Sequence, residues 1–147
     1  MADSLVQALQ DDATKKAVIA DSVQVIEEEV ASKGGLRGAA IKTGFKTVKK
    51  LKPGIIAAAV ERLLPEFAPA VDPFYARARE AGNVRSWFTT NADEIADALL
   101  AITDAKAAGA DNRVMKKVYS SLRGQAKMHT AAAMPRVAGL IERHVGG

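Results

Sequence analysis

The chain has 147 residues, a formal net charge of +4 and no cysteine. This length suits one domain over residues 1–147 with an ordinary apolar core. Without cysteine there is no disulfide, thiolate metal ligand or thiol nucleophile. No apolar run approaches the roughly 18 residues of a membrane span, and Met1–Ser4 lacks the features of a secretory signal, so we expect a cytoplasmic protein without a transmembrane segment.

Abundant alanine and apolar residues at helical spacing predict an all-α fold. A short opening helix, capped by Asp3 or Ser4, is expected to end near Gln10. Pro53 would occupy the first turn of a later helix, where its missing N–H costs nothing. The long helices predicted in the first half of the chain span 12–32, 36–51 and 53–65.

A proline-rich joint is expected near the middle of the chain. Pro65, Pro69 and Pro73 disfavour continuous helix, so residues 65–73 are predicted to form an ordered connector. Further on, Asn91 and Glu94 have the spacing of a capping box. The helices predicted beyond the joint span 74–81, 91–107, 112–131 and 134–145.

The two halves of the sequence resemble each other. Similar segments recur in the same order, with 19–28 matching 95–104, 41–49 matching 115–123, and 60–62 matching 141–143. This predicts an internal repeat, about 12–66 and 90–147, joined through 67–89. We therefore expect a helical bundle or orthogonal array of about seven to eight helices in two pseudo-symmetric halves. Chance similarity between amphipathic alanine-rich helices is the alternative.

Charge is distributed unevenly along the chain. No Asp or Glu lies between Glu29 and Glu61, or between Asp111 and Glu142. The basic helices in these intervals could bind a nucleic acid or an anionic surface. Alternatively, their cations could be solvated and partly paired with the acidic helix that precedes each. The candidate polyanion-binding residues are Lys42, Lys46, Lys49, Lys50, Lys116, Lys117, Arg123 and Lys127.

Most of the aromatic residues cluster around the predicted joint. We expect them to fill the core between the two halves, although a seam there could also hold an apolar ligand. The candidate seam residues are Phe67, Phe74, Tyr75, Trp87 and Phe88.

No catalytic or metal-binding pattern is recognisable. His129 and His144 lack the spacing of paired metal ligands. The adjacent acids Glu27–Glu29 point in different directions on a helix. The glycines at 34, 35 and 38 lack the strand and the Gly-Lys-Ser/Thr ending of a phosphate loop. We therefore expect no enzyme activity, catalytic residue, metal or cofactor.

Residues 36–67 resemble a family of uncharacterised small proteins of actinobacteria. The segments Lys52-Pro53-Gly54 and Glu61-Arg-Leu-Leu-Pro-Glu-Phe67 are the most distinctive, and the likeness extends over most of the chain. The resemblance implies a bacterial cytoplasmic setting and assigns no activity to any residue.

These observations favour a non-enzymatic interaction or scaffold protein, whose partner is another protein or a second copy of the chain in a homodimer. One alternative is nucleic-acid or other polyanion binding through the two basic helices. Another is apolar small-molecule binding at the seam between the halves.

Overall fold

A computed structural model describes residues 4–146, apart from the side chain of Arg37. These residues form eight α-helices and no strand, which confirms the predicted all-α fold. The helices are α1 (Leu5–Ala8), α2 (Asp12–Ser32), α3 (Gly35–Leu51), α4 (Ile55–Ala81), α5 (Val84–Thr90), α6 (Ala92–Ala108), α7 (Arg113–Ala132) and α8 (Met134–His144).

Most helix ends lie where local signals predict them. The Ser4 side chain accepts a hydrogen bond from the backbone N–H of Gln7 and so caps α1, while the alternative cap, Asp3, lies outside the described residues. Asn112 caps α7 in the same manner. Gly82 ends α4 with φ +87°, a left-handed conformation that glycine adopts without a steric penalty.

The joint predicted over 65–73 is wrong. The helix α4 begins at Ile55, after a turn that contains Pro53, and continues without interruption to Ala81. Neither the predicted end at Pro65 nor a separate helix over 74–81 exists. The middle of the chain is thus a single helix of 27 residues rather than a connector.

The three prolines are tolerated within α4 because they share one exposed face. Pro65, Pro69 and Pro73 are four residues apart, so the carbonyls that lose an intrahelical N–H lie on the solvent side, where water can bind them. The opposite face is buried and holds the helix against the core. Its buried residues are Ala68, Val71, Tyr75 and Ala78.

The sequence did not predict α5, and the predicted capping box is wrong. Asn83 caps α5 by accepting a hydrogen bond from the backbone N–H of Ser86. Asn91 makes no capping bond to α6; its side-chain N–H instead donates to the carbonyl of Trp87 at 2.9 Å. The Asn91 side chain therefore binds a carbonyl at the end of α5 and does not cap α6.

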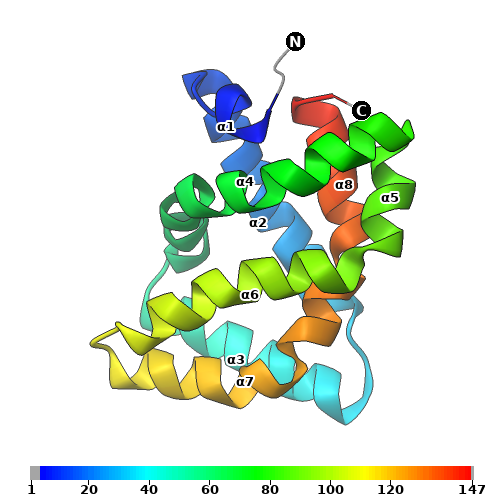
Figure 1. The fold of residues 1–147 in the computed structure, drawn as a ribbon. Helices are drawn as coiled ribbons and strands as arrows, with labels where there is room; N and C mark the ends of the chain where they lie inside the picture. The colour runs from blue at the N-terminus through cyan, green and yellow to red at the C-terminus, as the bar shows by residue number, and fades with distance from the viewer. Residues whose placement is uncertain (1–3, 147) are drawn as a thin grey trace.

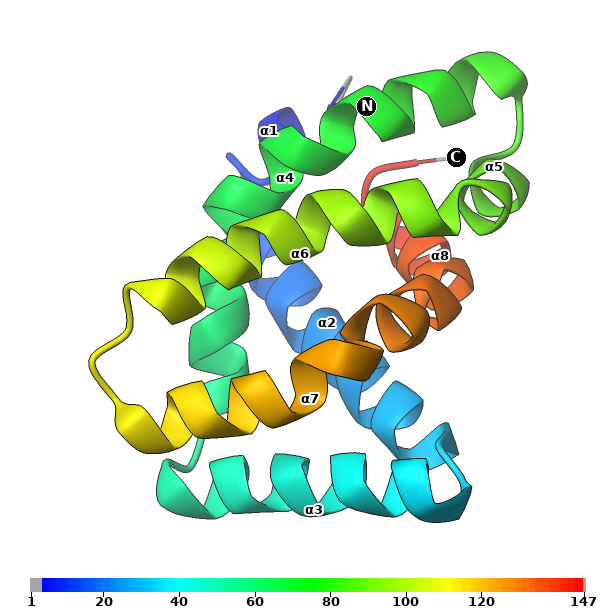
Figure 2. The same cartoon turned by 60° about the horizontal axis from the view of Figure 1, so that its bottom comes forward.

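The helices cross one another in an orthogonal array (Figure 1). At one end of the molecule α1, α4, α5 and α8 surround the larger core cluster, which includes Tyr75, Phe88, Ile95 and Met134. At the other end α3 and α7 lie side by side (Figure 2). Between these ends, α2 packs against α3, α4 and α8, while α6 packs against α4 and α7.

The described helices of this chain do not include a candidate for a membrane span, because none combines sufficient length with sufficient apolar character.

Candidate functional site

An apolar cavity of about 320 Å³, partly open to solvent, lies within the helical array. Its walls come from α2, α4 and α8, and residues of α1 and α6 complete the lining. Members of both core clusters contribute, so the space interrupts what would otherwise be one continuous core. The lining residues are Leu5, Leu9, Val18, Ser22, Val25, Ile26, Ile56, Ala59, Val60, Leu63, Leu64, Phe67, Ala68, Val71, Leu99, Val137, Leu140, Ile141 and Val145.

The longest wall of the cavity is one face of α4. Its lining residues recur every three or four positions from Ile56 to Val71, which is the spacing that places side chains on one side of a helix. This wall extends on both sides of Pro65. The continuity of α4 through its prolines is therefore what makes a cavity of this length possible.

The lining contains one polar side chain, Ser22, and no ionisable group. The Ser22 hydroxyl makes no hydrogen bond to another described residue. A site of this composition attracts apolar molecules by the hydrophobic effect. The free hydroxyl can also bind one polar atom of such a molecule.

Ion pairs beside the cavity hold its α2 and α8 walls together. Asp21 Oδ2 on α2 accepts hydrogen bonds from Arg143 at 3.0 and 2.8 Å and lies 2.9 Å from His144 Nε2. Burial raises the pKa of Asp21, but the hydrogen bonds from Arg143 and His144 outweigh it and hold this pKa below its ordinary value of 3.8. A second cluster joins Arg136 of α8 to Glu28 and Glu29 at 2.6 and 2.9 Å.

A carboxylate on α4 fixes α1 over the cavity. Asp72 Oδ1 accepts a hydrogen bond from the Leu5 backbone N–H at 2.6 Å, and Asp72 Oδ2 accepts one from Val6 at 3.3 Å. Leu5 is buried and lines the cavity together with Leu9. The four-residue helix α1 is thus anchored as a cover.

The structure separates the five candidate seam residues. Tyr75 and Phe88 are buried in the larger core cluster. Phe74 and Trp87 pack against that cluster, with their ring centroids 6.1 Å apart. Only Phe67 lines the cavity. The apolar space therefore lies among aliphatic residues, away from most of the aromatic ones.

Three of the eight candidate basic residues are engaged with acidic helices of the same chain. Lys49 Nζ lies 3.0 Å from Glu27 Oε1. Arg123 makes two hydrogen bonds to Asp104, at 2.7 and 3.0 Å. Together with a hydrogen bond from the Tyr119 hydroxyl, they lower the pKa of Asp104. The third ion pair joins Lys127 to Asp97 at 3.1 Å.

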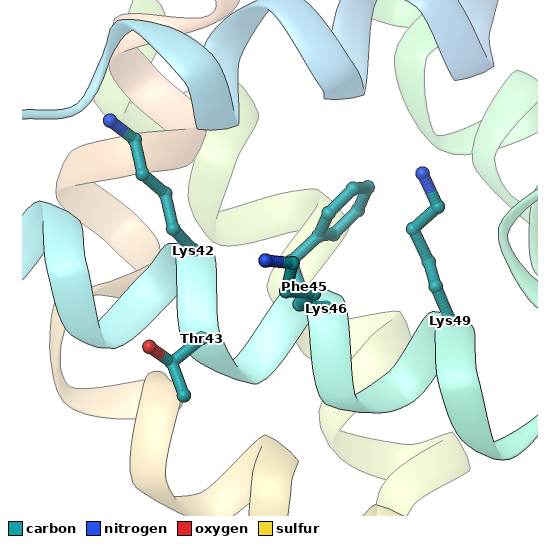
Figure 3. Close-up of a pocket in the computed structure, with 5 residues that line it drawn as sticks. All are labelled: Lys42, Thr43, Phe45, Lys46 and Lys49. Atoms are coloured by element: carbon teal, nitrogen blue, oxygen red, sulfur yellow. The ribbon is translucent and has the colours of Figure 1, made fainter.

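The other five candidate cations are exposed and make no ion pair with a described residue: Lys42, Lys46, Lys50, Lys116 and Lys117. On α3, Lys42, Lys46 and Lys49 flank a shallow surface hollow with Phe45 (Figure 3). Lys42 and Lys49 point toward α2 in this view, and the Lys49 ammonium lies 5.3 Å from the centroid of the Phe45 ring. This hollow is open and holds no enclosed space for a ligand.

Sequence reasoning missed the cavity. Its lining residues have the spacing of ordinary core faces, because an apolar side chain has the same local pattern whether its neighbour is another side chain or empty space. No signal in the sequence distinguishes the two cases.

Comparison with known proteins identifies a family but no function. The family of unknown function DUF6918 matches residues 5–145. No curated protein and no solved structure shows a significant similarity to the chain. Because the match spans the whole helical array, cavity included, the chain belongs to the family of unknown function DUF6918.

Proposed function

We propose that the protein binds a small apolar molecule in the cavity between α2, α4 and α8 and does not transform it chemically. The observation that carries this proposal is a lining in which Ser22 is the only polar residue among nineteen. General acid–base and nucleophilic catalysis both need ionisable or activated groups beside the reacting atoms. The lining contains none, which supports binding rather than turnover.

The size of the cavity indicates the class of ligand. A cavity of about 150 Å³ in another protein takes up one benzene molecule. The cavity here is about 320 Å³, so a ligand of roughly a dozen carbon atoms fits by proportion. A medium-length hydrocarbon chain with one polar end, which Ser22 could bind, matches both the volume and the lining.

The apolar walls of the cavity support the same proposal. The cavity is partly open to solvent, so these walls contact water when no ligand is bound. An apolar ligand that fills the cavity removes the walls and its own surface from water, which contributes about 25 cal/mol for each Å² of apolar surface buried.

The test is a titration with the uncharged fluorophore 1-N-phenylnaphthylamine, followed by displacement with 1-decanol. We expect saturable binding of one fluorophore per chain and full displacement by the alcohol. Decanol should also raise the thermal midpoint of unfolding, since a ligand that binds only the folded state stabilises it. If neither compound binds saturably, the proposal is wrong.

The other interpretations stay predictions. The scaffold function, a homodimer and a bacterial cytoplasmic setting are expected from the sequence, and each is accessible to direct measurement. A scaffold would form a defined oligomer in sedimentation analysis whose state does not depend on decanol. Polyanion binding is weakened as a proposal by the ion pairs of Lys49, Arg123 and Lys127 with acidic side chains of this chain.

A further inference from the structure

Positive charge is concentrated in two neighbouring helices. Together α3 and α7 contain ten of the 21 Lys and Arg residues and none of the 17 Asp and Glu residues. The remainder of the chain, with eleven cations against all 17 acids, is therefore net acidic. Such a separation produces a strong local potential although the net charge of the whole chain is modest.

These two helices form one layer at an end of the molecule (Figure 2). They pack closely where Gly44 of α3 meets α7: a Cβ built at Gly44 would lie 3.7 Å from the side chain of Leu122. Behind them lie α2 and α6, whose acids bind Lys49, Arg123 and Lys127. The opposite side of the layer faces solvent.

The cations that point away from α2 and α6 have no acidic partner. Four of them are exposed and make no ion pair with any described residue; they are Lys46, Lys50, Arg113 and Lys117. Four cations on two adjacent helices form a surface that attracts an anionic partner. We call these residues, with the apolar ones below, the outer face of α3 and α7.

The outer face also exposes large apolar side chains. Five such residues are exposed in the described part of the chain, and four of them lie on α3 and α7. They are Leu36, Leu51, Val114 and Met128, with exposed fractions from 49% to 92%. At about 100° per residue, Leu36 and Leu51 lie within about 60° of each other around α3, and Val114 and Met128 within about 40° around α7.

We infer that the outer face of α3 and α7 docks on an anionic lipid membrane. Lys and Arg side chains attract anionic headgroups, and exposed leucine, valine and methionine side chains gain by insertion at the boundary between headgroups and acyl chains. A nucleic acid would use the cations but not the apolar residues. No aromatic side chain on this face is exposed for stacking on bases.

Docking would also bring the cavity close to a source of apolar molecules. The first turn of α4, with Ile56 on the cavity wall, follows α3 after the turn at 52–54. Uptake or release of the ligand at the bilayer is a consequence that rests on the proposed function. Docking itself does not depend on it.

The experiment is sedimentation of the full chain with phosphatidylcholine vesicles that contain a quarter phosphatidylglycerol, at low and at physiological salt. We expect binding to these vesicles, weaker binding at higher salt and little binding to pure phosphatidylcholine. The triple variant Lys46→Gln, Lys50→Gln, Lys117→Gln should lose on the order of 100-fold in affinity, since each charge contributes about fivefold.

Two further variants separate this mechanism from a general effect of net charge. The triple variant Lys16→Gln, Arg62→Gln, Arg77→Gln removes as much charge from exposed positions outside α3 and α7; it should change vesicle affinity by less than about threefold. The double variant Leu36→Ser, Leu51→Ser keeps every charge, and we expect it to bind at least tenfold more weakly. Circular dichroism of each variant checks that the fold is retained.

Three results would overturn the inference. The chain could fail to bind the anionic vesicles at low salt. The two triple variants that remove charge could weaken vesicle binding equally. Finally, the chain could bind a duplex DNA oligonucleotide at physiological salt while ignoring the vesicles, in which case the cations would serve a nucleic acid. A cavity variant such as Ala59→Leu should bind vesicles normally, so failure of ligand binding and failure of docking are distinguishable.

Discussion

Filling part of the cavity should stabilise the empty protein and weaken ligand binding together. Ala59 lines the cavity from α4, and the substitution Ala59→Leu would project three more carbon atoms into the space. At about 0.8 kcal/mol for each buried carbon group, the gain is at most about 2.4 kcal/mol. Ordering the leucine side chain costs about 0.5–1 kcal/mol. We therefore expect a rise of about 1.5 kcal/mol in the free energy of unfolding without ligand.

The same three carbons exclude an equal part of the ligand. Their displacement should cost decanol about 2.4 kcal/mol of binding free energy, which corresponds to roughly 50-fold in affinity. Urea denaturation measures the first effect, and displacement of 1-N-phenylnaphthylamine measures the second. The matched control is Ala57→Leu, two residues away on the exposed side of α4, which should change neither quantity appreciably.

A filled core in place of the cavity would give the opposite result in Ala59→Leu. In a close-packed core, extra methylene groups cost about 1–3 kcal/mol because neighbouring side chains and backbone must move. A loss of stability of this size in Ala59→Leu, with ligand affinity unchanged, would show that there is no space to fill. Equal effects from Ala57→Leu would show that helix propensity, rather than the cavity, determines the result.

Three further predictions test the surroundings of the cavity. Pro69→Ala should raise the free energy of unfolding by about 2 kcal/mol, since alanine gains about 3 kcal/mol in a helix interior and loses about 1 kcal/mol through a freer unfolded chain; a lower free energy of unfolding, measured by urea denaturation, would contradict a continuous α4. Asp72→Ala should cost about 1.5–3 kcal/mol and speed amide hydrogen exchange in α1, because two backbone N–H groups lose a charged acceptor; unchanged exchange would mean that α1 is not held by this carboxylate. The Asp21 pKa is lowered in the folded state, so its contribution to stability is present above the ordinary value of 3.8 and disappears as pH falls through the folded value. Urea midpoints measured from neutral to acid pH should therefore fall less steeply in Asp21→Asn than in the unchanged chain, and identical slopes would refute the role assigned to Arg143 and His144.

The internal repeat over 12–66 and 90–147 stays a prediction, although the packing is compatible with it. In the repeat α2, α3 and the first part of α4 would correspond to α6, α7 and α8. A pseudo-two-fold axis would then superpose α2 on α6, α3 on α7 and the first part of α4 on α8. The pair α2–α8 would correspond to the pair α6–α4, and α3 would lie against α7. These three pairs are in contact. A superposition of separately determined halves would test the relation directly.

Local chemistry was sufficient to predict most of the helices. Caps such as Ser4 and Asn112, the end at Gly82 and the apolar spacing act within a few residues, so the sequence predicts α2, α3, α6, α7 and α8 closely. The sequence also indicated, as one alternative, that the cations of each basic helix are partly paired with the acidic helix that precedes it. The acidic helix before each basic one does bind part of its cations, through Glu27 on α2 and through Asp97 and Asp104 on α6.

Only the tertiary structure decided the continuity of α4 and the existence of the cavity. Three prolines disfavour helix locally, but their shared exposed face and the burial of Val71 and Tyr75 on the other side outweigh that preference. The cavity depends on how far α2, α4 and α8 stand apart, and this distance is set by contacts between residues remote in sequence, such as Asp21 with Arg143. Apolar periodicity states which side chains avoid water; whether they meet each other or leave a space is a property of the assembled helices.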